Sequence, residues 1–126
     1  AIRRPGPYQV QAAIAALHAQ AASYAETDWA QIRLLYDQLD RLTPSPVVRL
    51  NRAVATRYTH GAANALRELD RLETDLRDYR LWYAVRGELL RDLGRTEEAR
   101  LADKRALELA TNPAERELLA RRLAEA

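Results

Sequence analysis

Four small residues recur at regular spacings in the last third of the chain and constrain its fold more than any other feature. Gly87, Gly94, Ala99 and Ala106 are separated by seven, five and seven residues. Where the two helices of a hairpin cross closely, the interface is densely packed and leaves no room for larger side chains. The spacing therefore predicts a helical hairpin that turns at Gly94.

The same ladder resembles that of tetratricopeptide repeats, in which hairpins of about 34 residues stack side by side. Gly61 precedes Gly94 by 33 residues, and Thr27 precedes Gly61 by 34. The period predicts three units, of which the third is the clearest. Thr27 replaces the turn glycine in the first, and Val54 and Leu66 occupy positions in the second where small residues are typical. Asp103 stands where an aromatic residue is usual. An ordinary antiparallel helical array is the alternative.

Composition and charge favour an all-α protein. The 126 residues are rich in Ala, Leu, Arg and Glu, which are strong helix formers. The net charge of +2 comes from interleaved signs, whereas a nucleic-acid binder typically carries a one-sided basic stripe. No cysteine is present, so a reducing cytoplasm is the simplest compartment. No apolar run approaches the ~20 residues that a membrane span requires.

Helix-start signals divide the chain into units. Asp28 and Ser45 are expected N-cap residues, Pro46 follows at a first helical position, and Asn112 with Pro113 repeats that pattern near the C-terminus. Apolar residues at helical spacing follow each start. We predict one TPR-like all-α solenoid over 1–126, with hairpins over 6–42 (its first helix over 8–24), 45–72 and 79–110, a connecting loop over 73–78, and a capping helix over 113–125.

Two sets of residues follow from this register. Small residues at crossings and turns, together with aromatic side chains that bury large areas, are expected to pack the repeats: Trp29, Tyr36, Gly61, Tyr83, Gly87, Gly94, Ala99 and Ala106. The first helix of each hairpin is expected to line a partner-binding groove, with the candidates Tyr24, Arg49, Asn51, Arg52, Tyr58, Glu88 and Arg91. Asn51 either hydrogen-bonds a partner's backbone or terminal carboxylate, or ties two helices together. Arg49 and Arg52 either contact acidic groups of a partner or are solvated.

The sequence carries no recognisable catalytic motif. His18 and His60 are the only histidines and do not stand at metal-ligand spacing. No phosphate-cradling glycine loop is present, and no serine or threonine lies in a nucleophile motif. Glu97 and Glu98 suit the first turn of a helix, where they favour its dipole. We therefore expect no enzyme, no cofactor and no metal, and a function based on binding.

Several longer segments resemble one family in order and spacing. GPYQVQAAIAALHA over 6–19, TDW over 27–29 and PSPVVRLNRAVA over 44–55 are similar to bacterial extracytoplasmic-function sigma factors that carry a long C-terminal tetratricopeptide-like extension. LGRTEEA over 93–99 and NPAER over 112–116 also fit that family's pattern. The chain departs from it at 56–59, which is more polar than usual, and at Asp103, where the family has tyrosine.

The resemblance implies that this chain is the extension alone, with the polymerase-binding and promoter-reading regions before Ala1. It implies a regulatory or protein-interaction role that supports sigma-dependent transcription in the bacterial cytoplasm. The implied partners are the N-terminal sigma domains, RNA polymerase and a small protein with an Asp-Gly-Pro-Phe motif, while promoter DNA is contacted only through regions absent here. Two other hypotheses are a free-standing adaptor that binds a peptide or protein, and a domain that binds nucleic acid directly.

Overall fold

Seven α-helices make up the computed structural model, which describes residues 6–20 and 27–125. In chain order they are α1 (Pro7–Gln20), α2 (Trp29–Leu42), α3 (Pro46–His60), α4 (Ala62–Asp70), α5 (Arg80–Asp92), α6 (Thr96–Leu109) and α7 (Pro113–Glu125). No strand occurs within these two ranges. The predicted all-α class is confirmed.

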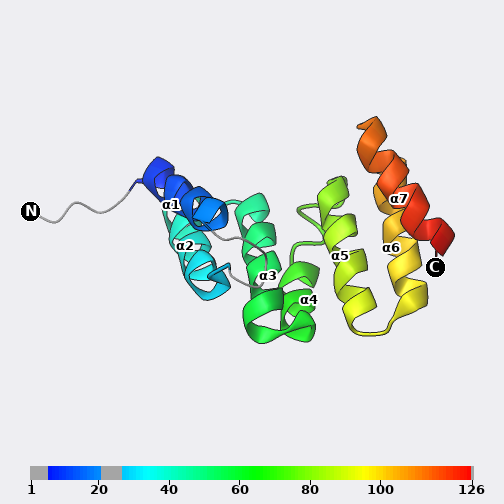
Figure 1. Cartoon of the computed structure of the whole chain (residues 1–126), viewed down its shortest axis with the longest axis horizontal. Helices are drawn as coiled ribbons and strands as arrows, with labels where there is room; N and C mark the ends of the chain where they lie inside the picture. The colour runs from blue at the N-terminus through cyan, green and yellow to red at the C-terminus, as the bar shows by residue number, and fades with distance from the viewer. Residues whose placement is uncertain (1–5, 21–26, 126) are drawn as a thin grey trace, which may run out of the picture.

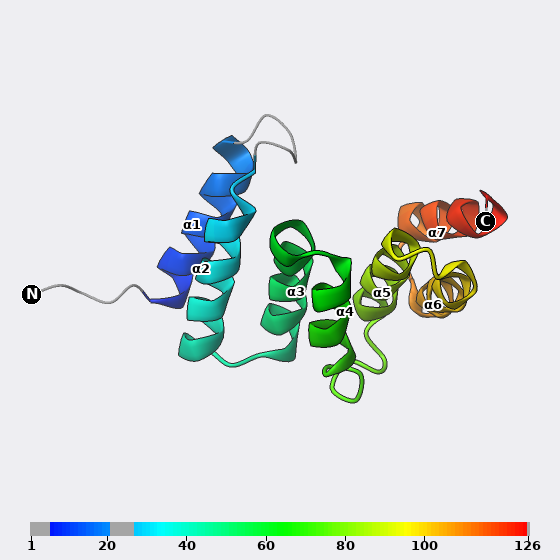
Figure 2. The ribbon, with the colours of Figure 1, turned by 90° about the horizontal axis from the view of Figure 1, so that it is seen from below.

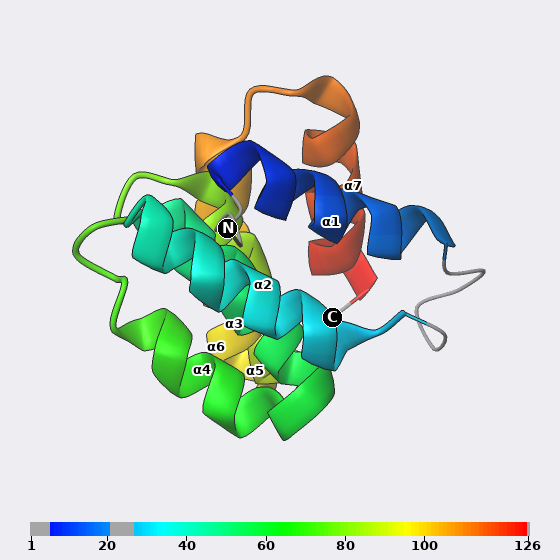
Figure 3. The ribbon, with the colours of Figure 1, turned by 90° about the vertical axis from the view of Figure 1, so that its left-hand side faces the viewer.

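The helices form a row of adjacent hairpins (Figure 1). Each helix packs on the next one in the chain, and the one further pairing among the described helices is between α3 and α5. The view from below shows α1 with α2, α3 with α4, and α5 with α6, followed by α7 (Figure 2). Seen from the end that holds α1, the later helices lie behind α1 and α2 (Figure 3). Contacts confined to neighbouring units are typical of stacked helical repeats.

Side-chain caps set the starts of three helices, as the sequence predicts. The Asp28 carboxylate accepts a hydrogen bond from the backbone N–H three residues later at 3.1 Å, and the Ser45 hydroxyl accepts the corresponding bond at 3.5 Å. The Asn112 side-chain oxygen accepts from the N–H groups two and three residues later, at 2.9 and 3.3 Å. Each cap satisfies donors that the first turn of a helix leaves unpaired.

Two glycines provide the turns within the second and third hairpins. Gly61 has φ +89° and Gly94 has φ +73°, in the left-handed region that other residues rarely adopt. Gly61 alone separates α3 from α4. After Gly94, the N–H of Arg95 donates to the carbonyl of Leu90 at 2.9 Å, which closes the end of α5. The positive φ angle of each glycine therefore permits a tight reversal of the chain.

The connection between α4 and α5 differs from the polar loop expected over 73–78. Helix α4 ends at Asp70, and residues 71–78 form consecutive turns. Leu72 and Leu76 from these turns are buried in the largest core cluster. The connection is therefore anchored by apolar side chains, and the second hairpin joins the third through a packed segment.

The core consists of three apolar clusters along the stack. One joins α1, α2 and α3, the largest joins α3 to α6, and a small one joins α6 to α7. The first contains Val10, Ile14, Ile32, Leu39 and Ala55, with Trp29 and Tyr36 packed against it. Burying a large apolar side chain contributes about 1.5–3 kcal/mol to the stability of the fold, so each cluster stabilises the packing of successive units.

Helix α1 begins at Pro7 and is described as far as Gln20. The predicted first helix extends to Tyr24, which lies outside the described residues. None of the described helices has the length and apolar character needed to cross a bilayer.

Candidate interaction surface

The predicted groove residues lie on two helices and face different neighbours. Helix α3 carries Arg49, Asn51, Arg52 and Tyr58, and α5 carries Glu88 and Arg91. Tyr24 lies outside the described part of the chain. Five of the six described candidates, all but Asn51, interact with side chains of other helices, which are α2, α3, α4, α6 and α7. The six therefore do not form one uninterrupted lining.

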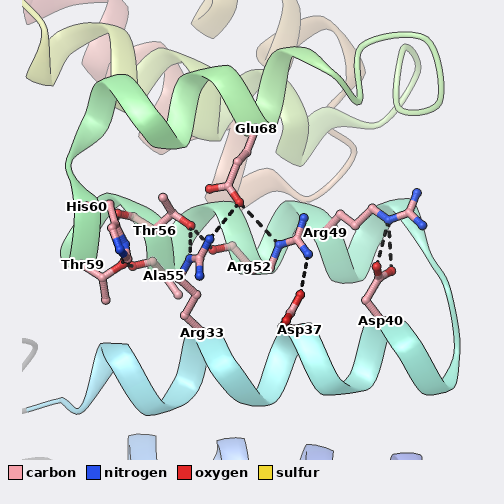
Figure 4. Close-up of polar contacts among 10 residues, drawn as sticks. All are labelled: Arg33, Asp37, Asp40, Arg49, Arg52, Ala55, Thr56, Thr59, His60 and Glu68. Carbon is pink, nitrogen blue, oxygen red and sulfur yellow. Dashed lines mark hydrogen bonds and ion pairs between the residues drawn. The ribbon is translucent and has the colours of Figure 1, made fainter.

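Arg49 and Arg52 are directed towards carboxylates of α2 (Figure 4). Arg49 Nε lies 3.1 Å from both carboxylate oxygens of Asp40, and Arg52 Nη1 lies 2.9 Å from Asp37 Oδ1. Burial raises the pKa of Asp40, but hydrogen bonds from the Ser45 N–H and the Arg49 guanidinium hold it below its ordinary value. Both arginines therefore help to fasten α3 to α2.

Glu68 links three helices from its position on α4 (Figure 4). Its Oε1 lies 3.5 Å from Arg52 Nε and 3.6 Å from Arg33 Nη2. Arg33 comes from α2 and Arg52 from α3, so one carboxylate bridges the boundary between the first and second hairpins. Ion pairs shielded from water hold their geometry better than fully exposed pairs.

The polar run 56–59 is accommodated by the same region of α3. Thr56 is buried, accepts a hydrogen bond from Arg33 Nε at 2.8 Å, and donates to the carbonyl of Arg52 at 3.1 Å. The Thr59 hydroxyl lies 3.2 Å from the carbonyl of Ala55. A buried hydroxyl that both donates and accepts a hydrogen bond avoids the cost of an unpaired polar group, which explains how the polar run fits the fold.

Tyr58 forms part of an aromatic stack between α1, α2 and α3. Its ring lies 4.3 Å from that of Trp29 with an interplanar angle of 14°, and His18 meets Trp29 edge-on at 5.3 Å. The Arg57 guanidinium lies 5.4 Å from the centroid of the Tyr58 ring. Tyr58 is nevertheless 45 % exposed.

Arg57 connects the second hairpin to the third. Its Nε and Nη2 bind the two carboxylate oxygens of Asp92 at 2.6 and 2.9 Å, and its Nη1 binds Glu88 Oε2 at 2.9 Å. The hydrogen bonds to Asp92, helped by the negative charges of Asp92 and Glu88, raise the pKa of the Arg57 guanidinium. A forked, two-point pair of this kind fixes orientation as well as distance. Glu88, a predicted groove residue, thus already pairs with Arg57 of its own chain.

Asp103 is completely buried, with 0 % exposure. Its two carboxylate oxygens accept hydrogen bonds from Arg91 Nη2 and, at 3.0 Å, from Arg122 Nη2. Arg122 also lies 3.9 Å from Glu88. Removing either partner of such a buried pair leaves a charge that water cannot fully solvate. Asp103 therefore joins α5, α6 and α7 at the position where an aromatic side chain is usual.

Asn51 makes no side-chain hydrogen bond to any residue within 6–20 or 27–125. It is half-buried on α3. No described hydrogen bond therefore supports the interpretation that Asn51 ties two helices together. Its role in binding a partner stays a prediction.

The residues predicted to pack the repeats lie at helix interfaces and turns. Ala99 and Ala106 are buried without exposure, Trp29 and Tyr36 pack against the first cluster, and Tyr83 packs against the other two. Burial raises the pKa of Tyr36. Gly87 is buried against Asp103 and the Ala99 carbonyl. No group of His, Asp and Glu side chains suited to a metal occurs among the described residues.

Sequence reasoning missed the acidic and basic residues that complete these networks: Arg33, Asp37, Asp40, Arg57, Glu68, Asp92, Asp103 and Arg122. One signal was present, because Arg57 and Asp92 are separated by about one repeat length, as expected for residues that face each other in successive units. A second signal was Asp103, an acidic residue at a position where an aromatic side chain is usual.

The fold and these surfaces define a stack of helical hairpins of the tetratricopeptide type. Among curated proteins, the chain is similar to an uncharacterized protein of Rhizobium meliloti (strain 1021), with 55 % identity over 113 residues. That match covers 90 % of this chain and 27 % of the relative, so the chain spans about a quarter of the relative's length. No protein-family model matches the chain.

Proposed function

We propose that this chain is a regulatory, protein-interaction segment of a bacterial extracytoplasmic-function sigma factor that acts in the cytoplasm. One observation carries the proposal. The three segments that resemble the family, over 6–19, 27–29 and 44–55, lie on α1, at the start of α2 and on α3, and contribute Val10, Ile14 and Ala55 to one buried cluster. The resemblance thus follows residues that together build the first half of the stack.

The architecture supports a role in contact. Stacked hairpins present side chains from several units on one extended surface, and Tyr58 with Asn51 on α3 offers an exposed aromatic ring and an amide without a described partner. The proposed partners are the N-terminal sigma domains, RNA polymerase, and a small protein with an Asp-Gly-Pro-Phe motif. In the Rhizobium relative, the matching segment belongs to a longer chain, which agrees with a role as one part of a larger protein.

The proposal is tested with the full-length polypeptide that contains this segment. Run-off transcription from its own promoter is compared with and without residues 1–126, and the separated segment is titrated into the preceding domains by calorimetry. We expect saturable binding and higher transcription when the segment is present. Equal transcription together with no binding would refute the proposal. A preceding sequence without a polymerase-binding region would favour the free-standing adaptor.

A point variant localises the contact. Asn51→Ala removes an amide that no described residue binds, so folding should be unchanged while binding to the sigma domains weakens. Gln31→Ala, which removes an exposed amide on α2, is the matched control. Equal binding by both variants would exclude Asn51 from the interface.

A further inference from the structure

An open recess of about 450 Å³ lies between α2, α3 and α4. It crosses the boundary between the first and second hairpins, away from the contacts of Glu88 and Arg91. Its charged and polar lining is contributed by Arg33 from α2, Arg52 and His60 from α3, Arg67 and Glu68 from α4, and Arg71 directly after α4. Four arginines in one small recess require an account of what balances their charge.

Intramolecular pairing balances two of the four arginines. Arg33 and Arg52 share Glu68, and Arg52 also binds Asp37 (Figure 4). Arg67 near the end of α4 and Arg71 directly after it form no ion pair with a carboxylate of the described residues. Arg67 donates to the amide oxygen of Asn64. Two positive charges therefore remain in excess beside a preformed Arg33–Glu68–Arg52 network.

The next recess along the stack provides an internal comparison. It has about 310 Å³ and is lined by residues of α5 and α6 and by Glu73 from the preceding turns. Five of its eight lining residues stand 34 positions after residues of the first recess: Arg86, Glu98, Leu101, Ala102 and Arg105. Arg71 corresponds to Arg105, but Arg67 corresponds to Leu101. The second recess holds two arginines, Arg86 and Arg105, and two acids, Glu73 and Glu98, so its formal charges cancel. The repeat therefore builds a recess at both positions and makes only the first one cationic.

We propose that the first recess binds a phosphate group of a small molecule. Arginine presents a planar fork of N–H donors that matches phosphate oxygens, and Arg67 and Arg71 both line the recess at the C-terminal end of α4. A phosphomonoester carries about −1.5 to −2 charges at neutral pH, which suits the excess of two. A ligand held by Arg33 and Arg71 at once would bridge α2 to the residue that follows α4, and would stabilise the packing of the first hairpin on the second. The proposal is independent of the sigma-factor assignment.

The test is a titration of the chain with inorganic phosphate and with pyrophosphate at constant ionic strength, followed by NMR of the arginine Nε–Hε groups and the backbone amides. We expect saturable shifts confined to the recess, largest at Arg33, Arg67 and Arg71, and a thermal midpoint that rises with ligand concentration. Equal shifts on addition of sodium chloride or acetate would overturn the proposal. So would shifts spread evenly over all arginines of the chain.

Variants then separate binding from general electrostatics. The double change Arg67→Gln and Arg71→Gln should raise the dissociation constant at least tenfold, whereas Arg105→Gln, at the equivalent site of the second recess, should change it less than twofold. Circular dichroism checks that each variant folds, and the shift map of the unchanged chain gives an answer that needs no variant. An unchanged affinity in the double variant would overturn the assignment. A short DNA duplex that binds these arginines more than tenfold tighter than pyrophosphate would also overturn it.

Discussion

Helix α5 packs tightly on α6 where Gly87 meets Asp103, and Gly87→Ala tests this contact. A Cβ at position 87 would lie 2.4 Å from Asp103 Oδ1, 3.2 Å from its Cγ and 3.5 Å from the Ala99 carbonyl oxygen. The Asp103 side chain is not free to turn away, because Arg91 and Arg122 hold its two oxygens. The added methyl group must therefore displace a buried, hydrogen-bonded carboxylate.

Two opposing terms set the size of the effect. Overpacking lowers the free energy of unfolding by about 1–3 kcal/mol. Replacing a helical glycine by alanine raises it by about 1 kcal/mol. We therefore expect Gly87→Ala to lower the free energy of unfolding by up to about 2 kcal/mol. In an Asp103→Ala background the two close atoms are absent, and Gly87→Ala should instead stabilise the chain by about 1 kcal/mol. The sign of the effect reverses.

The assay is urea denaturation of four chains, namely the unchanged protein, each single variant and the double variant. Far-ultraviolet circular dichroism follows helix content, and linear extrapolation gives the free energy of unfolding of each chain. We expect a coupling energy of about 1–3 kcal/mol between the two sites. Additivity within about 0.5 kcal/mol, or stabilisation by Gly87→Ala in the unchanged chain, would refute this account of the α5–α6 contact.

Three further predictions concern a cap, a turn and a charge. Ser45→Ala removes the acceptor for the first turn of α3 and should cost about 1 kcal/mol of unfolding free energy; Ser45→Asp, which keeps an acceptor, should cost much less by the same urea assay. Gly94→Ala forces a side chain into φ +73° and should cost about 1–2 kcal/mol although no atom obstructs it, so an unchanged denaturation midpoint would contradict the turn. The lowered pKa of Asp40 contributes stability that is complete above its ordinary pKa of 3.8 and is lost as pH falls through the lower folded value. Asp40→Asn should therefore flatten the acid side of the stability curve, and an unaltered slope would exclude this pair as its source.

Helix starts were predictable because their chemistry is local. Asp28, Ser45 and Asn112 each bind backbone donors within three residues, so a short stretch of sequence contains the whole interaction. The end of α4 was harder to predict because Leu72 and Leu76 continue the apolar pattern beyond Asp70. Those leucines are buried by turns that pack on the third hairpin, so hydrophobicity persists where the helix itself has stopped.

The networks of charged side chains were harder to predict because their partners lie in different units. Asp103 is visibly unusual in the sequence, but its partners Arg91 and Arg122 belong to the preceding and following helices. Their approach depends on the crossing of α5 with α6 and on the docking of α7. The pairing of Arg57 with Asp92 likewise depends on the register of successive units, which a degenerate period gives only approximately.

The ion pairs also decide which residues can report on partner binding without altering the fold. Glu88 and Arg91 already bind Arg57, Arg122 and Asp103, so a partner that used them would have to replace hydrogen bonds made within the chain, and their substitution would lower stability before it changed affinity. Asn51 has no such described bond to lose. A loss of binding to the proposed partner in Asn51→Ala, at unchanged free energy of unfolding, would therefore indicate contact at α3. A similar loss in Glu88→Gln could be interpreted only together with a measurement of its stability.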